Sequence, residues 1–264
     1  MKFDPRALRF TCQGSCLVGI VDVPERPLPR GVLVLTGGPQ YRVGGHRQFT
    51  LLARMLAPRG IPVMRFDHRG MGDSEGAPRA YDDIGDDVRA AMKEFFMQVP
   101  EMKEIVIWGL DDAATAAALY AHTDARVRAL VLLNPWVRDP HGADRASLMP
   151  HLRARFGELG FWRKVASGSR EAGAGAPRHD LRAAALDADL PLQQRIMAAL
   201  TCFEGHTMVI LGGADPQAHE FSELLDKHEA RVRRVTIAGA NHSFASREWR
   251  DEVAETSANW IMSW

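Results

Sequence analysis

The sequence has little cysteine, no net charge and no long hydrophobic run, and each shortage excludes a class of protein. Among its 264 residues, 33 Lys and Arg balance 33 Asp and Glu, so no net positive charge attracts a nucleic acid or an anionic membrane. The longest apolar runs, at residues 31–35 and 105–110, are far shorter than the roughly 20 residues of a transmembrane helix. We therefore expect a small-molecule partner, no bound nucleic acid and no membrane span.

The few cysteines and the start of the sequence exclude further classes of protein. Cys12, Cys16 and Cys202 are an odd number and lack the paired spacing of a zinc site, so we predict neither a disulfide framework nor a metal. The first residues carry charges and contain no apolar stretch, so no secretory signal is predicted. We expect a cytoplasmic protein without a cofactor, and nothing in the sequence indicates its oligomeric state.

What the chain does contain is a regular alternation of strand-like and helix-like segments. The predicted strands cover residues 8–12, 16–23, 31–35, 61–66, 104–108, 127–133, 207–211 and 232–237. The predicted helices cover residues 47–56, 83–97, 112–121, 218–230 and 248–262. This order predicts an α/β fold with a mostly parallel eight-stranded sheet and helices on both faces.

The alternation stops between residues 138 and 200. This stretch is rich in Arg, Ala and Asp, includes a Gly/Ala/Pro segment at 171–177, and shows only short helical patterns. We predict a small helical cap here, inserted into a core formed by residues 1–137 and 201–264. Trp136 and Trp162 are candidates to line a substrate pocket, although simple packing explains such aromatics equally well. The arginines of the cap either bind an anionic ligand or cover a solvated helix face.

The turn after the predicted strand 104–108 carries the first chemical signal. It reads G-L-D-D-A at residues 109–113 and leads into a helix of small residues, which resembles the nucleophile elbow G-x-S-x-G. Gly109 and Ala113 supply the small side chains that a close strand-to-helix approach needs. Asp111 stands at the nucleophile position. Alternatively, Asp111 is an ordinary N-cap residue of the helix.

Two further residues follow in the order nucleophile, acid, histidine that is typical of α/β-hydrolases. Asp215 lies in the loop G-G-A-D-P after strand 207–211, and His242 lies in the short loop before the last helix. An aspartate before proline is also common in plain turns. We predict Asp111, Asp215 and His242 to be the catalytic residues.

An oxyanion hole is expected from two backbone N–H groups. One belongs to Asp112, the residue after the elbow, and one to the loop T-G-G-P-Q at residues 36–40. Pro39 has no N–H, so Gly38 is the preferred donor, with Gln40 as the second choice and as a candidate substrate-binding residue. A plain glycine-rich turn is the alternative.

The segment D-H-R-G-M-G-D-S at residues 67–74 resembles a loop of many α/β-hydrolases. We interpret it as structural, with Arg69 expected to pair with Asp67 or Asp73. Ser74 lies outside the elbow and is not expected to be a nucleophile.

Four further motifs narrow the resemblance: G-G-P-Q-Y-R-V-G at residues 37–44, H-R-Q-F at 46–49, L-N-P-W-V-R at 133–138 and F-W-R-K at 161–164. They resemble the exosortase A system-associated hydrolases of exopolysaccharide-producing bacteria. That resemblance implies an acyl ester or thioester substrate and a role in polysaccharide export and protein sorting. In that family the elbow carries Cys or Ser before Asp-Ala-Ala, whereas this chain has Asp111.

The aspartate leaves three hypotheses. In the first, the protein is an acyl ester or thioester hydrolase or acyltransferase that Asp111 makes weak or inactive, because two carboxylates beside His242 favour the imidazolium. In the second, Asp111 attacks an alkyl carbon directly, as in haloalkane dehalogenases and epoxide hydrolases. The former have Trp where this chain has Asp112, and the latter need cap tyrosines, which residues 138–200 lack. The third is a non-catalytic ligand-binding protein.

Overall fold

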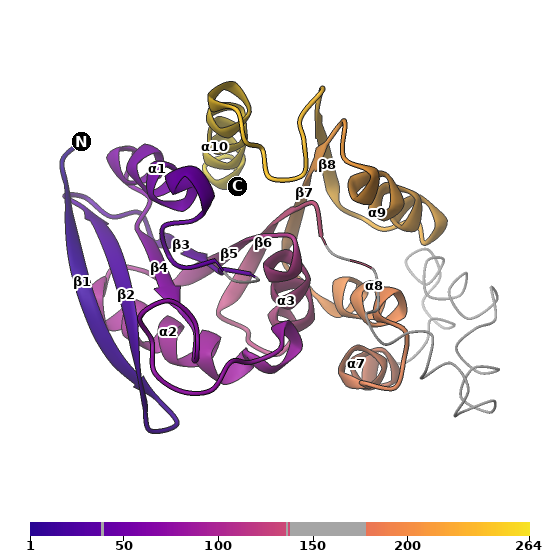
Figure 1. Ribbon diagram of the computed structural model, residues 1–264, viewed down its shortest axis with the longest axis horizontal. Helices are drawn as coiled ribbons and strands as arrows, with labels where there is room; N and C mark the ends of the chain where they lie inside the picture. Colours follow the sequence, from indigo (N-terminus) through magenta and orange to yellow (C-terminus); the bar gives the residue numbers. More distant parts are fainter. Residues whose placement is uncertain (38–39, 136, 138–177) are drawn as a thin grey trace.

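A twisted sheet forms the centre of the molecule in the computed structural model, which describes residues 1–37, 40–135, 137 and 178–264 (Figure 1). Its strands are β1 (Phe3–Cys12), β2 (Ser15–Pro24), β3 (Arg30–Val34), β4 (Val63–Asp67), β5 (Glu104–Leu110), β6 (Val127–Leu133), β7 (His206–Gly212) and β8 (Arg233–Ile237). The strand order is β1-β2-β4-β3-β5-β6-β7-β8. The predicted eight-stranded α/β fold is confirmed.

Strand direction places the functional loops. The β1–β2 hairpin is antiparallel and β2 also runs antiparallel to β4, whereas β4, β3, β5, β6, β7 and β8 are parallel. Parallel strands bring their carboxyl ends to one edge of the sheet, where α/β proteins bind ligands. The loops after β3, β5, β7 and β8 therefore meet at this edge.

Helices cover both faces of the sheet. The helices α1 (Gln48–Leu56) and α10 (Arg247–Ile261) bury their apolar residues on one face and lie at the top of Figure 1. The helices α2 (Gly85–Gln98), α3 (Asp112–Ala121), α8 (Leu192–Cys202) and α9 (Pro216–Lys227) contribute to the core on the other face. Short 3-10 turns occupy Gly45–Arg47, Ala57–Arg59 and Tyr81–Asp83.

Alternation along the central strands explains why they are apolar at successive residues. In β5, Val106 and Trp108 pack with α1 and α10, while Ile105 and Ile107 pack on the opposite face. All four are at most 3% exposed. A strand covered on both faces buries every side chain, so its sequence reads as a continuous apolar run.

The described end of the predicted cap consists of two helices, α7 (Arg178–Leu186) and α8. Helix α8 contacts α3, and its Ile196 and Met197 are fully buried in the same apolar cluster as the alanines of α3. Residues 138–177, including Trp162, lie outside the described part. The division into core and cap therefore stays a prediction.

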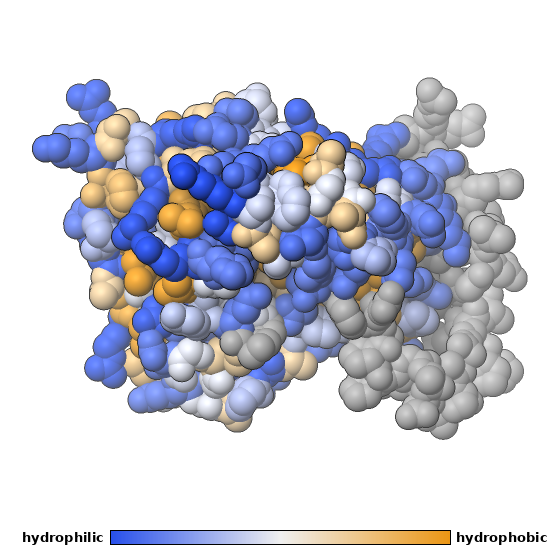
Figure 2. All heavy atoms as spheres, turned by 45° about the horizontal axis from the view of Figure 1, so that its top comes forward, coloured by the Kyte–Doolittle hydropathy of each residue, from blue (hydrophilic) through white to orange (hydrophobic). Residues whose placement is uncertain are grey.

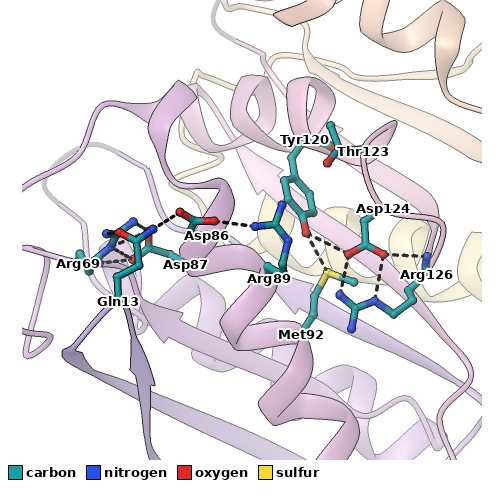
Figure 3. A network of polar contacts seen from close by, with 10 residues as sticks. All are labelled: Gln13, Arg69, Asp86, Asp87, Arg89, Met92, Tyr120, Thr123, Asp124 and Arg126. Carbon is teal, nitrogen blue, oxygen red and sulfur yellow. Dashed lines mark hydrogen bonds and ion pairs between the residues drawn. The ribbon is translucent and has the colours of Figure 1, made fainter. Parts of the chain in front are cut away.

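The loop after β4 corrects one expectation. Arg69 pairs with Asp87 of α2, not with Asp67 or Asp73 (Figure 3). Those two aspartates are bound by Arg42, which arrives from the loop between β3 and α1. The pairing thus depends on a residue that the local motif does not contain.

Polar contacts continue from this loop across α2 to α3. Asp86 accepts hydrogen bonds from Gln13 of the hairpin and from Arg89, and Tyr120 of α3 donates to Asp124 (Figure 3). Burial, with Asp124 nearby, raises the pKa of the Tyr120 hydroxyl. The Tyr120 hydroxyl also lies 3.9 Å from Met92 Sδ, so it joins α3, the helix that follows the predicted elbow, to α2.

The surface agrees with the balanced composition. Figure 2 shows a face dominated by hydrophilic residues, with hydrophobic ones visible in small separate groups. Within the described ranges, no helix is both long and apolar enough to cross a membrane.

Candidate active site

Asp111 forms a strained turn between β5 and α3. Its φ of 60° and ψ of −125° lie in a region that glycine adopts easily and other residues rarely do. Its backbone N–H donates to Leu133 O at 2.9 Å, which extends the sheet to the turn. Its side chain makes no capping hydrogen bond to α3. The side chain is thus held above the sheet edge by its own backbone.

The turn needs small neighbours. A Cβ atom on Gly109 would lie 2.6 Å from the carbonyl oxygen of Ala113, closer than any normal contact. The strand and the helix therefore pass each other where only glycine fits. This is the close approach that the sequence pattern predicted.

The histidine and the second aspartate form a couple. His242 Nδ1 lies 2.9 Å from Asp215 Oδ2, and Asp215 is 5% exposed. The other carboxylate oxygen of Asp215 accepts the Gln217 backbone N–H at 3.2 Å, so Asp215 also caps α9. This arrangement fixes the ring orientation and keeps the proton on Nδ1, leaving Nε2 to face the elbow.

The structure brings all three predicted catalytic residues together. His242 Nε2 lies 3.5 Å from Asp111 Oδ2, and the Gln217 amide donates to Asp111 Oδ1 at 3.0 Å. The side chains of Asp111 and His242 are 37% and 38% exposed, so a ligand can reach both. Asp111, His242 and Asp215 thus form a chain that leads from solvent into the protein.

The charges of this chain stabilise each other. The hydrogen bond with Asp111 is the main cause that raises the pKa of His242 to about 9; burial opposes the rise and Asp215 adds to it. Burial pushes the pKa of Asp111 upwards, but hydrogen bonds from His242, Gln217 and the Asp112 backbone N–H lower it overall. At neutral pH the site therefore holds an imidazolium between two carboxylates.

The predicted oxyanion loop lies against the elbow. A Cβ on Gly37 would fall 1.6 Å from Asp112 Oδ1, so this loop and the Asp112 side chain are in direct contact. Gly38 lies outside the described residues. The Gln40 N–H donates to Gly37 O at 3.2 Å and is thus used inside the loop. The Asp112 N–H interacts with the Asp111 carboxylate.

Sequence reasoning missed two residues of the site, Gln217 and Asn134. Asn134 is fully buried at the carboxyl end of β6. Its amide donates to His242 O and accepts from the Gly212 N–H, both at 2.8 Å. Gln217 follows Asp215-Pro216 directly. The sequence signal for Asn134 was a polar residue directly after a buried strand. The signal for Gln217 was a side-chain amide two residues after Asp215.

The remaining candidates are settled or fall outside the described residues. Ser74 donates to Asp67 O at 2.6 Å and accepts from the Val18 N–H at 2.9 Å, which makes it a structural link. Trp136, like Trp162, is not described. In the part of the chain that is described, no group of three His, Cys, Asp or Glu side chains is placed to hold a metal ion.

Comparison with known proteins supports the assignment of the fold. Residues 32–256 match the alpha/beta hydrolase family. An esterase from Pyrococcus furiosus has a TM-score of 0.70 at 16% identity, covering 99% of this chain and 92% of its own. A serine hydrolase without a lid from Xanthomonas campestris has a TM-score of 0.61 at 19% identity, covering 100% and 98%. Dienelactone hydrolase from Anabaena variabilis has a TM-score of 0.64 at 16% identity, covering 100% and 99%. No curated protein matches the sequence.

Proposed function

Since the chain belongs to the alpha/beta hydrolase family, we propose that it is an esterase-like hydrolase for an acyl ester or thioester, with Asp111 in the nucleophile position. One observation carries this proposal. Asp111 keeps the strained backbone of an elbow and faces His242, which is oriented by Asp215. Strain of this kind costs about 1–3 kcal/mol and persists where the surroundings enforce it, often at functional sites.

The charge state of the site implies weak or absent acyl transfer in this form. Acyl transfer by Ser or Cys needs a neutral histidine that can accept the proton of the nucleophile. In this form the hydrogen bond with Asp111 is the main cause that raises the pKa of His242 to about 9, so the histidine is already protonated at neutral pH. A carboxylate that attacks an ester also forms an anhydride, which offers no gain in stability over the substrate. We therefore propose that hydrolysis requires Ser or Cys at position 111.

The substrate and the cellular setting come from the resemblance to exosortase A system-associated hydrolases. On that basis we propose a cytoplasmic role linked to exopolysaccharide export. Gly38 and Asp112 would then donate to the oxyanion, and Gln40, Trp136 and Trp162 would line the acyl site. These assignments stand on the sequence motifs.

The test compares the protein with its Asp111→Ser and Asp111→Cys variants on p-nitrophenyl esters and acyl thioesters, with His242→Ala added to each background. The proposal expects turnover in the Ser or Cys variant that His242→Ala abolishes. If the Asp111 protein itself hydrolyses these substrates through His242, the proposed inactivity is wrong. If no variant turns over and ligands only stabilise the fold, a binding protein is the better description.

A second candidate function is favoured by the donors on Asp111. Gln217 and the Asp112 N–H both interact with its carboxylate, which is how an oxyanion at the Asp111 carbonyl would be held. In this candidate, Oδ2 forms a bond to an alkyl carbon while the carbon–halogen bond breaks and halide leaves. With an epoxide, the ring C–O bond breaks instead and the ring oxygen takes the proton of the His242 imidazolium. The ester has no charge, so the pKa of His242 falls and the imidazole can accept a proton from water. The hydroxide adds to Cγ of the ester and gives a tetrahedral intermediate. When this intermediate collapses, the alcohol leaves and takes its proton from His242.

The two candidates separate in a trapping experiment. The His242→Ala variant is incubated with an alkyl bromide or an epoxide, and the peptide containing position 111 is weighed by mass spectrometry. An added alkyl group that is absent from the matched His242→Ala, Asp111→Asn double variant supports the second candidate. No adduct with either reagent argues against it.

A further inference from the structure

The carboxyl end of β6 lies between the strands that lead to the predicted catalytic residues. In the sheet, β5 leads to Asp111, β7 leads to Asp215 and the loop after β8 carries His242, while β6 stands between β5 and β7. The strand β6 supplies none of these three side chains. Leu133, its last residue, and Asn134, the next one, nevertheless bond to all three loops.

Leu133 holds the elbow, and Asn134 holds the other two loops. The Leu133 carbonyl accepts the Asp111 N–H at 2.9 Å. The Asn134 side chain accepts the Gly212 N–H and donates to the His242 carbonyl, both at 2.8 Å. Because Gly212 ends β7 and leads into the loop of the acid, one buried side chain joins the acid loop to the histidine loop.

Two independent features of position 134 select asparagine. A backbone N–H on one side and a carbonyl on the other require a side chain that both accepts and donates, as an amide does and a carboxylate or an alkyl group does not. The φ of Asn134 is 38°, in the left-handed region that asparagine enters more readily than most residues. Asn134 is also fully buried, so solvent does not compete for its two bonds.

The two loops leave the amide little freedom to move. A Cβ atom added to Gly212 would lie 2.8 Å from Ala240 O and 3.3 Å from Asn134 Nδ2. The acid loop therefore packs directly against the histidine loop and against the amide that joins them. A side chain of another shape or polarity at position 134 would have to move one of these loops.

We propose that Asn134 is a positioning residue for His242, whose amide sets how far the imidazole reaches from Asp215 towards position 111. The inference rests on the proposed function, because it takes these side chains as the reacting groups. Asn134 holds the His242 backbone, and Asp215 holds Nδ1 at 2.9 Å. With these two points fixed, the place of Nε2, 3.5 Å from Asp111 Oδ2, is determined.

The first test measures the pKa of His242 by NMR titration of the full-length protein, which needs no turnover. Asn134→Leu removes both side-chain bonds at nearly constant size. Asn134→Ser leaves room for a water molecule and serves as the second variant if the leucine variant does not fold. The matched control is Tyr120→Phe, which removes the hydrogen bond of a buried side chain to Asp124 at the far end of α3.

Both Asn134 variants should lower the pKa of His242 by about one pH unit, because a displaced ring loses part of the hydrogen bond with Asp111 that mainly raises this pKa. Tyr120→Phe should leave the pKa unchanged. Thermal unfolding checks that each variant is folded at the temperature of the titration. An unchanged pKa of His242 in a folded Asn134 variant would overturn the proposal.

The second test adds the folded Asn134 variant to Asp111→Ser and measures hydrolysis of a p-nitrophenyl ester. We expect kcat to fall about tenfold to hundredfold and KM to change less than about twofold, because a misplaced base slows proton transfer while the substrate contacts remain. An unchanged kcat, with or without a rise in KM, would contradict the positioning role. If Asp111→Ser itself shows no turnover, the proposed function fails, and the titration still decides the role of Asn134.

Discussion

Two aspartates at the carboxyl ends of β4 and β5, strands that β3 separates in the sheet, have opposite surroundings. Asp67 ends β4 and is fully buried, while Asp111 follows β5 and its side chain is 37% exposed. The Asp67 carboxylate accepts hydrogen bonds from the Arg42 guanidinium and from the backbone N–H groups of Arg42 and Asp73. The Asp111 carboxylate faces an imidazole and a side-chain amide instead.

The two residues have the same type and similar places in the sheet, but different groups donate hydrogen bonds to their carboxylates. This difference gives them different roles. A guanidinium and backbone amides keep their protons at every physiological pH, so the charge pattern around Asp67 is constant. An imidazole gains and loses a proton, so the charge at Asp111 can change during a reaction. Asp67 therefore stabilises a loop, and Asp111 is suited to chemistry.

The largest expected effect breaks the buried pair. Asp67→Asn should lower the free energy of unfolding by about 3 kcal/mol, because it removes the buried carboxylate that binds Arg42 and leaves this guanidinium with the exposed Asp73 alone. Asp111→Asn should change it by less than about 1 kcal/mol, since the exposed pair is screened by solvent. Urea denaturation measures both. Equal losses in the two variants would contradict the distinction.

A glycine in each loop gives a second test. A Cβ on Gly72 would lie 2.3 Å from Asp67 Oδ2, and one on Gly109 would lie 2.6 Å from Ala113 O. We expect Gly72→Ala and Gly109→Ala each to lower the unfolding free energy by about 1–3 kcal/mol. Only Gly109→Ala should also change the NMR pKa of His242, because it displaces the elbow. A shift of that pKa in Gly72→Ala would count against the separation.

The pH dependence of stability sharpens the comparison further. The pKa of His242 is raised to about 9, above the value near 6.5 expected in the unfolded chain. Its stabilising contribution is fully present below pH 6.5 and is lost as the pH rises from 6.5 to 9. Asp111→Asn should lower the pKa of His242 in an NMR titration and flatten the stability curve in this window. An unchanged titration would mean that Asp215 alone sets the pKa.

A smaller effect than those of Asp67→Asn and the two glycine variants is expected for Gln217. Gln217→Leu removes one donor from the Asp111 carboxylate, so the pKa of Asp111 should rise. The unfolding free energy should fall by only about 1 kcal/mol, the net value of one hydrogen bond. Carbon-13 NMR of the labelled carboxylate measures the shift. As the control, adding Gln217→Leu to the Asp111→Asn variant should not change the free energy of unfolding of that variant.

Most of the fold was predictable because strands that are buried on both faces of the sheet appear in the sequence as continuous apolar runs. The predicted bounds of α3 and β6 agree with the structure residue for residue. The start of β1 was missed by five residues, since Phe3 to Leu8 form an edge that is largely exposed and includes Pro5, so no apolar pattern marks it.

The candidate site was predictable to the extent that chain order fixes it. Asp111, Asp215 and His242 each follow a strand, so the parallel sheet brings them to one edge. Asn134 and Gln217 had only local signals in the sequence, and their roles were missed because these depend on partners more than a hundred residues away. The wrong partner for Arg69 has the same origin, since Arg42 approaches the loop from another element.

The hydrogen bonds of Asn134 have a consequence for motion. The loops that carry Asp215 and His242 are joined through Asn134 and through the Gly213 and Ala214 N–H groups, which donate to Ile237 and Ala240. They should move as one rigid body, with a nearly constant distance between His242 and Asp215. The contact between His242 and Asp111 is longer, 3.5 Å against 2.9 Å for His242 and Asp215, so we expect thermal motion to vary it more.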